Sequence, residues 1–124
     1  MDIVNQLPLQ RYRKVDDLLA FAAIYDDEKR EQAYKRLLLR HKKQIQGSVC
    51  LEVGCGFGLF SKYLAKLGAK RVYAVEINPT MAAIARERLM PYSQVTVVQS
   101  DIRDFLPPEP VQVCLLYTSP SPRD

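Results

Sequence analysis

Apolar residues recur at helical spacing in two stretches near the start of the chain. Leu18, Leu19 and Ala22 have this spacing in residues 16–25, and the pattern continues among strong helix formers over residues 27–46. We therefore predict two helices ahead of any sheet, which together form an N-terminal region over residues 1–46.

Short β-prone runs alternate with amphipathic segments over residues 47–113. The apolar runs predict buried strands, and the segments between them predict helices, the second of which has Asn78 as its N-cap and Pro79 at its first position. The resulting β-α-β-α-β order favours parallel pairing with right-handed crossovers and helices on both faces of the sheet. The predicted strands cover residues 49–53, 71–75, 95–98 and a start at 111, and the predicted helices cover residues 59–67 and 79–90.

The last stretch, CLLYTSPSPRD at residues 114–124, does not fit the continuation of a buried strand, because its prolines cannot donate to a regular ladder. It also matches, codon for codon, the translation of a common transposase sequencing adapter. We interpret residues 114–124 as a non-native tail and expect the natural chain to continue past Val113. A natural disordered tail rich in proline and serine is the alternative.

Composition limits the class of protein. The 124 residues, 48% apolar and 26% charged, are typical of one small globular domain. A net charge of +4 with interspersed acids gives no strong nucleic-acid signal. The three cysteines lack the close spacing of metal sites or disulfide frameworks, and no apolar stretch reaches the roughly 20 residues of a membrane span. We expect an intracellular protein without metal or membrane, in the cytoplasm or the nucleus.

A glycine-rich turn, Gly-Cys-Gly-Phe-Gly at residues 54–58, joins the first predicted strand to its helix. Such a turn lets the backbone approach a ligand and leaves N–H groups free at a helix N-terminus. Glu76 ends the next strand, where an acid can accept both hydroxyls of a ribose, and Asp101 follows the third strand. All three elements are expected at one edge of the sheet, where they would bind a nucleoside. A simple tight turn is the alternative.

The spacing of the turn narrows the choice of nucleoside. It is G-x-G-x-G rather than the dinucleotide pattern G-x-G-x-x-G, and Glu52 stands just before it. An acid at this position disfavours a pyrophosphate and favours a ligand with a cationic, amino-acid-like end. S-adenosylmethionine has such an end.

These segments resemble class I methyltransferases, whose domain is Rossmann-like. Residues 51–58 resemble the first motif of that group, residues 72–76 its strand with the ribose-binding acid, and residues 99–102 its adenine-contacting segment. The resemblance implies S-adenosylmethionine as the cofactor of an α/β methyltransferase domain.

The resemblance is most specific to the protein arginine methyltransferases. Residues 27–34 have the D-x-x-R-x-x-x-Y pattern of the helix that covers the cofactor in that family, at the family's distance from the glycine turn. The stretch 68–76 is similar too, and the whole resemblance covers about residues 20 to 113. Arg103 departs from the pattern, which has an acid there.

The resemblance also implies roles for single residues. Arg30 would hold the carboxylate of the methionine part, with Asp27 beside it, although an exposed ion pair between the two is the alternative. The other implied cofactor-binding residues are Tyr34 in the covering helix; Glu52 with the backbone of Gly54, Cys55 and Gly56 near the amino group; Glu76 with Ile77 at the ribose; and Asp101 with Ile102 at the adenine.

Catalytic residues are not assigned. In arginine methyltransferases the acceptor guanidinium is held by two glutamates in a loop after the fourth strand, and the chain ends before that loop. The resemblance implies a parent protein that methylates arginine side chains of protein substrates and forms a homodimer. We expect the fragment itself to be inactive, with weak cofactor affinity. The alternatives are a methyltransferase acting on RNA or a small molecule, or a non-catalytic cofactor-binding fragment.

Overall fold

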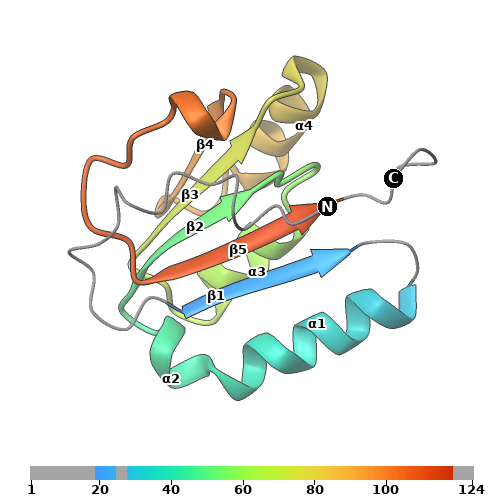
Figure 1. Ribbon diagram of the computed structural model, residues 1–124, viewed down its shortest axis with the longest axis vertical. Helices are drawn as coiled ribbons and strands as arrows, with labels where there is room; N and C mark the ends of the chain where they lie inside the picture. The colour runs from blue at the N-terminus through green and yellow to red at the C-terminus, as the bar shows by residue number, and fades with distance from the viewer. Residues whose placement is uncertain (1–18, 25–27, 119–124) are drawn as a thin grey trace.

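The computed structural model describes residues 19–24 and 28–118, and the side chains of residues 32–116. Five parallel strands form one sheet in the order β1-β5-β2-β3-β4, and Figure 1 shows their arrows pointing the same way. The α/β class predicted from the sequence is confirmed. The strands are β1 (Leu19–Ile24), β2 (Val49–Val53), β3 (Arg71–Glu76), β4 (Val95–Gln99) and β5 (Val113–Thr118).

The helices pack on one face of this sheet. Phe60 and Leu64 lie in a buried cluster with Val72 of β3, and Leu89 lies in a second cluster with Ala74 of the same strand. Since side chains alternate along a strand, Val72 and Ala74 share a face. The helices are α1 (Glu28–Arg40), α2 (Lys42–Ile45), α3 (Leu59–Lys66) and α4 (Pro79–Leu89), and a short 3-10 turn, η3, covers Ile102–Asp104.

The opposite face carries a third buried cluster, which includes Leu51, Val75 and Leu116. In the described part of the chain this face is covered by the segment after β4, through Ile102 and Phe105, and not by an α-helix. Within the described residues, the helices expected on both faces are therefore found on one face only. The physical reason is that the link between β4 and β5, with prolines at 107, 108 and 110, cannot form a long helix.

The predicted helix over residues 16–25 is wrong where the structure describes it, because Leu19–Ile24 form the edge strand β1. A short apolar run suits either a helix or a strand, and local pattern cannot decide between them. Pairing with β5, in register from Leu19 beside Val113 to Ile24 beside Thr118, decides it here. The helical prediction for residues 27–46 is confirmed by α1 and α2, which are separated at His41.

The predicted end of the fourth strand is also wrong. Strand β5 continues past Val113 to Thr118, between β1 and β2, and Cys114, Leu115 and Leu116 are buried. These residues are apolar and the first proline of the tail is Pro120, so the pairing groups of the strand remain intact. Residues 119–124 lie outside the described residues, and the adapter origin of the tail stays a prediction.

The topology determines where a ligand can bind. Strand β2 has β3 on one side and β5 on the other, so the order of the strands reverses there. Open α/β sheets bind ligands at the carboxyl ends of the strands at such a reversal. The described residues contain no helix long and apolar enough to cross a membrane and no cluster of potential metal ligands.

Candidate functional site

The glycine turn follows β2 at the reversal point. Gly54, Gly56 and Gly58 have φ angles of 75°, 54° and 87°, which glycine adopts without the strain of a side chain. The N–H groups of Gly54 and Cys55 donate to the Val75 carbonyl at 2.8 and 3.1 Å, so the turn is tied to the end of β3. The backbone is therefore held close to both strand ends.

Glu52 lies beneath this turn. Its side chain is 1% exposed, and its Oε1 accepts a hydrogen bond from Ser61 Oγ at 2.5 Å. The pKa of Glu52 is raised to about 8, mainly because the carboxyl is buried; hydrogen bonds from Ser61 oppose this rise, and the nearby Glu76 adds to it. No cation among the described side chains forms an ion pair with Glu52. Within the described part of the chain, the carboxyl is thus buried without a positive partner.

Glu76 ends β3 and also faces the turn. It is 8% exposed, its Oε1 accepts from the Gly56 N–H at 2.8 Å, and its Oε2 accepts from the Asn78 N–H at 2.9 Å. The carboxylate therefore joins the glycine turn to the first residues of the α4 region. Each oxygen of a carboxylate has two acceptor positions, so one remains on each for a further donor.

Asp101 follows β4 and caps η3. Its Oδ1 accepts from the backbone N–H of Arg103 at 2.9 Å, and its two oxygens accept from the Arg103 guanidinium at 3.0 and 2.6 Å. The hydrogen bonds from the Arg103 side chain are the main reason that the pKa of Asp101 falls to about 2. Asp101 is therefore ionised at neutral pH. Arg103, the departure from the family pattern, orients this acid.

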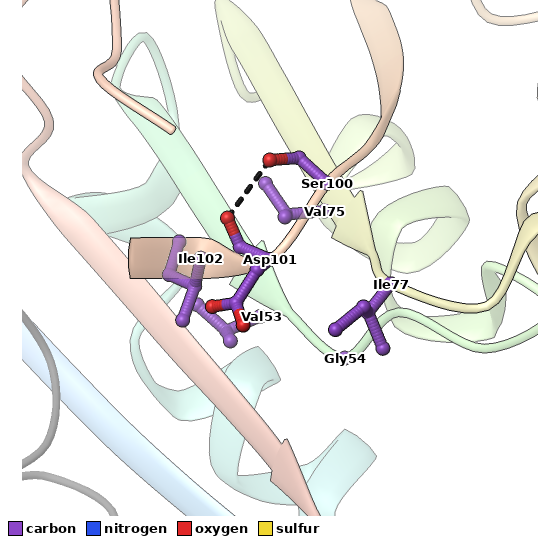
Figure 2. A pocket seen from close by; sticks show the side chains of 7 residues that line it. All are labelled: Val53, Gly54, Val75, Ile77, Ser100, Asp101 and Ile102. Carbon is purple, nitrogen blue, oxygen red and sulfur yellow. Dashed lines mark hydrogen bonds between the residues drawn. The ribbon is translucent and has the colours of Figure 1, made fainter. Parts of the chain in front are cut away.

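A pocket of about 170 Å³ opens where the three strands end (Figure 2). Most of its surface is apolar, and the Asp101 carboxylate lies across it from Ile77. The volume is below the 300–1,000 Å³ typical of whole drug-sized ligands, so the pocket suits a part of a cofactor, such as its base. It is lined by Val53, Gly54, Val75, Ile77, Ser100, Asp101 and Ile102.

The residues predicted from the sequence fall into three groups. Gly54, Ile77, Asp101 and Ile102 line the pocket. The second group, Glu52, Cys55, Gly56 and Glu76, lies at the same edge, in or against the glycine turn, but does not line the pocket. For the residues of both groups, contact with a cofactor stays a prediction.

The third group belongs to the N-terminal region. Tyr34 lies in α1, partly buried, with its ring 5.1 Å from that of Phe60, so it packs in the core and does not line the pocket. Asp27 lies outside the described residues, as does the side chain of Arg30. The placement of the covering helix over the cofactor therefore stays a prediction.

Sequence reasoning missed four residues of the site. Val53 and Val75 line the pocket, and the alternation of side chains along β2 and β3 could have placed them on one face. Ser100 lines it as well. Ser61 was missed because its contact with Glu52 depends on the path of the turn between them, for which the sequence gives no direct signal.

The arrangement fits S-adenosylmethionine better than a dinucleotide. Apolar walls with one ionised acid suit an adenine base, whose exocyclic amine needs an acceptor. The buried Glu52, without a positive partner among the described side chains, suits a ligand that carries a cationic amino group. A pyrophosphate would instead place its negative charge beside the Glu76 carboxylate and would further disfavour the ionisation of Glu52.

Comparison with known proteins gives the same result. A family model described as a methyltransferase domain matches residues 50–120, more than half of the chain. "Probable protein arginine N-methyltransferase 6.1" of Oryza sativa subsp. indica is 38% identical over 96 residues, which cover 75% of this chain and 25% of that protein. The chain thus spans about a quarter of the length of this curated relative.

Two solved structures are similar in fold. Protein arginine methyltransferase 10 of Arabidopsis thaliana matches with a TM-score of 0.68 and 32% identity over 73% of this chain and 26% of its own. The PRMT1 enzyme-prozyme complex of Trypanosoma brucei, solved with AdoHcy, matches with a TM-score of 0.66 and 29% identity over 70% of this chain and 28% of that one. These matches indicate S-adenosylmethionine as the cofactor. The chain therefore belongs to the methyltransferase domain family, as a class I S-adenosylmethionine-dependent domain that resembles the protein arginine methyltransferases.

Proposed function

We propose that the chain is the cofactor-binding part of a methyltransferase that acts on arginine side chains of proteins. The observation that carries the proposal is the meeting of the glycine turn, Glu76 and Asp101 at the carboxyl ends of three neighbouring strands. The acceptor class is supported by the likeness to arginine methyltransferases over about three quarters of the chain.

Each part of the site has a proposed task. The apolar pocket between Val53, Val75 and Ile77 receives the adenine, and Asp101 accepts from its amine. Glu76 accepts the ribose hydroxyls on the acceptor positions left free by the turn, and Glu52 faces the amino group of the methionine part. When bound, the cofactor supplies a methyl group on a sulfonium centre, which is transferred to the acceptor nitrogen.

The chain alone is proposed to bind cofactor weakly and to catalyse no transfer. Among the described residues that line the pocket, Asp101 is the one acid, so the lining contains no acidic pair to position an acceptor. Catalysis of this kind depends on positioning and electrostatics, which the proposal assigns to parts that the relatives have in addition. The homodimer and the cytoplasmic or nuclear location are likewise proposed for the parent protein and not for this chain alone.

Saturation-transfer NMR with millimolar S-adenosylhomocysteine tests the cofactor class, because it detects weak binding. We expect signal from the adenine and ribose protons, with little competition from NAD. Asp101→Ala should weaken binding at least tenfold, whereas Asp104→Ala, which removes an exposed acid from the same 3-10 turn, should leave it unchanged. Equal binding of NAD, or equal loss in both variants, would contradict the assignment of the pocket.

The acceptor class needs a second experiment. The uninterrupted gene beyond the codon for Val113 should encode a loop with two glutamates, and its product should transfer tritiated methyl to an arginine-containing peptide but not to its lysine counterpart. An Asn/Asp-Pro-Pro-aromatic segment at that place, or transfer to RNA only, would replace the arginine proposal with an RNA-directed one. The cofactor proposal would survive that outcome.

A further inference from the structure

Ser61 is a fully buried polar residue that the proposed function does not use. It is 0% exposed and occupies the third position of α3, after Gly58 as N-cap. It does not line the pocket, and its hydroxyl donates to Glu52 Oε1 at 2.5 Å. This contact joins Glu52, near the end of β2, to the first turn of α3, so it links the two elements on either side of the glycine turn.

The groups around Glu52 determine how strongly this hydrogen bond affects the ionisation of its carboxyl. Among the described side chains, the groups that face the carboxyl are Ser61 from α3, Cys55 in the turn and Glu76 from β3. None of them carries a positive charge. A hydrogen bond to a charged group stabilises that form more than a bond between neutral groups does, so the Ser61 hydroxyl favours the ionised carboxylate against burial and against Glu76.

We propose that Ser61 is a positioning residue for the cofactor site, whose hydroxyl holds the Glu52 carboxyl under the glycine turn and keeps it able to ionise for a cationic ligand. The part about the ligand rests on the proposed function. The part about Glu52 concerns the cofactor-free protein and can be tested there.

Ser61→Ala separates this role from simple packing. Alanine lacks only the hydroxyl, leaves little empty space and favours a helix more than serine does, so α3 should remain folded. Ser48→Ala is the matched control. Ser48 also donates its hydroxyl, to the Gln44 carbonyl, but it lies just before β2, at the opposite end of that strand from the turn.

The first measurement is a pH titration of the Glu52 carboxyl carbon by NMR without cofactor. The wild-type midpoint is expected near 8, where burial places the pKa. Ser61→Ala should raise it by about one unit or more, because the lost hydrogen bond favoured the ionised form. Ser48→Ala should leave it unchanged. An unchanged midpoint in Ser61→Ala would overturn the proposal, whether or not the chain binds a cofactor.

The second measurement is the affinity for S-adenosylhomocysteine at pH 6.5 and 8.5. If binding needs ionised Glu52 and the midpoint rises by one unit, Ser61→Ala should bind about tenfold more weakly than wild type at pH 6.5 and about threefold more weakly at pH 8.5. An equal loss at both pH values would mean a structural role only and would overturn the proposal. If the wild type binds no cofactor at either pH while the carboxyl titration still shifts, the proposed function fails and the hold of Ser61 on Glu52 stands.

Discussion

Replacing Glu52 with glutamine should stabilise the cofactor-free protein although it removes a proposed ligand-binding acid. The carboxyl is 1% exposed, its pKa is raised from 4.5 to about 8, and no described cation pairs with it. At pH 7 the unfolded chain therefore holds an ionised Glu52, and the folded chain holds a protonated one. A pKa unit corresponds to about 1.4 kcal/mol, so the gap between 4.5 and pH 7 lowers the folding stability by about 3 kcal/mol as an upper value.

The sign of this effect follows from the raised pKa. Below about pH 4.5 the residue is protonated in both states and the destabilisation is absent; it grows as the pH rises and is complete above about 8. Glutamine has no charge, but its carbonyl oxygen can still accept from Ser61. We therefore expect Glu52→Gln to be more stable than wild type by less than about 1 kcal/mol at pH 5 and by up to about 3 kcal/mol at pH 7.

Urea unfolding at pH 5, 7 and 8 measures this difference. The other titrating groups are the same in both proteins, so their contributions cancel in the comparison. A difference that does not change with pH, or a variant that is less stable at pH 7 and 8, would refute the account of Glu52 as a buried carboxyl without a positive partner.

Two further substitutions test the packing around the turn. A Cβ at Gly58, where φ is +87°, would lie 2.6 Å from Leu89 Cδ1, so Gly58→Ala should lower the free energy of unfolding in urea by about 2–4 kcal/mol. Gly47 has a similar φ but open space around it, so Gly47→Ala should cost less. Equal losses in the two variants would show that Leu89 of α4 does not pack closely against Gly58. Tyr73→Phe removes a hydrogen bond of 2.5 Å to Glu109, so it should raise the pKa of Glu109 from its lowered value. Carboxyl NMR would detect this change, and an unmoved pKa would refute the contact.

The elements that depend on local pattern could be predicted from the sequence. The glycine turn, the helix that begins at Pro79 and the strand that ends at Glu76 lie where the pattern placed them, because caps, turn residues and short β-prone runs act within a few positions. The segment 19–24 could not be predicted in this way. Its apolar residues suit a helix, and only pairing with β5, about ninety positions later, makes it a strand.

The site shows the same division. The sequence placed Glu52, Glu76 and Asp101 at the same edge, because parallel strands end together. It could not show that the first two carboxyls hold the turn through Ser61 and the Gly56 N–H, or that Arg103 orients Asp101. Those contacts depend on the path of the backbone between the strands, which no local pattern specifies.

The most direct test of the site is an amide chemical-shift map of the chain titrated with S-adenosylhomocysteine. The account predicts the largest changes at Gly54 and Gly56 in the turn, at Ile77 after β3 and at Ile102 after β4, with little change at the amino ends of the strands. Changes concentrated at those amino ends, or no change at millimolar ligand, would contradict the claim that the turn and the acids form one cofactor site.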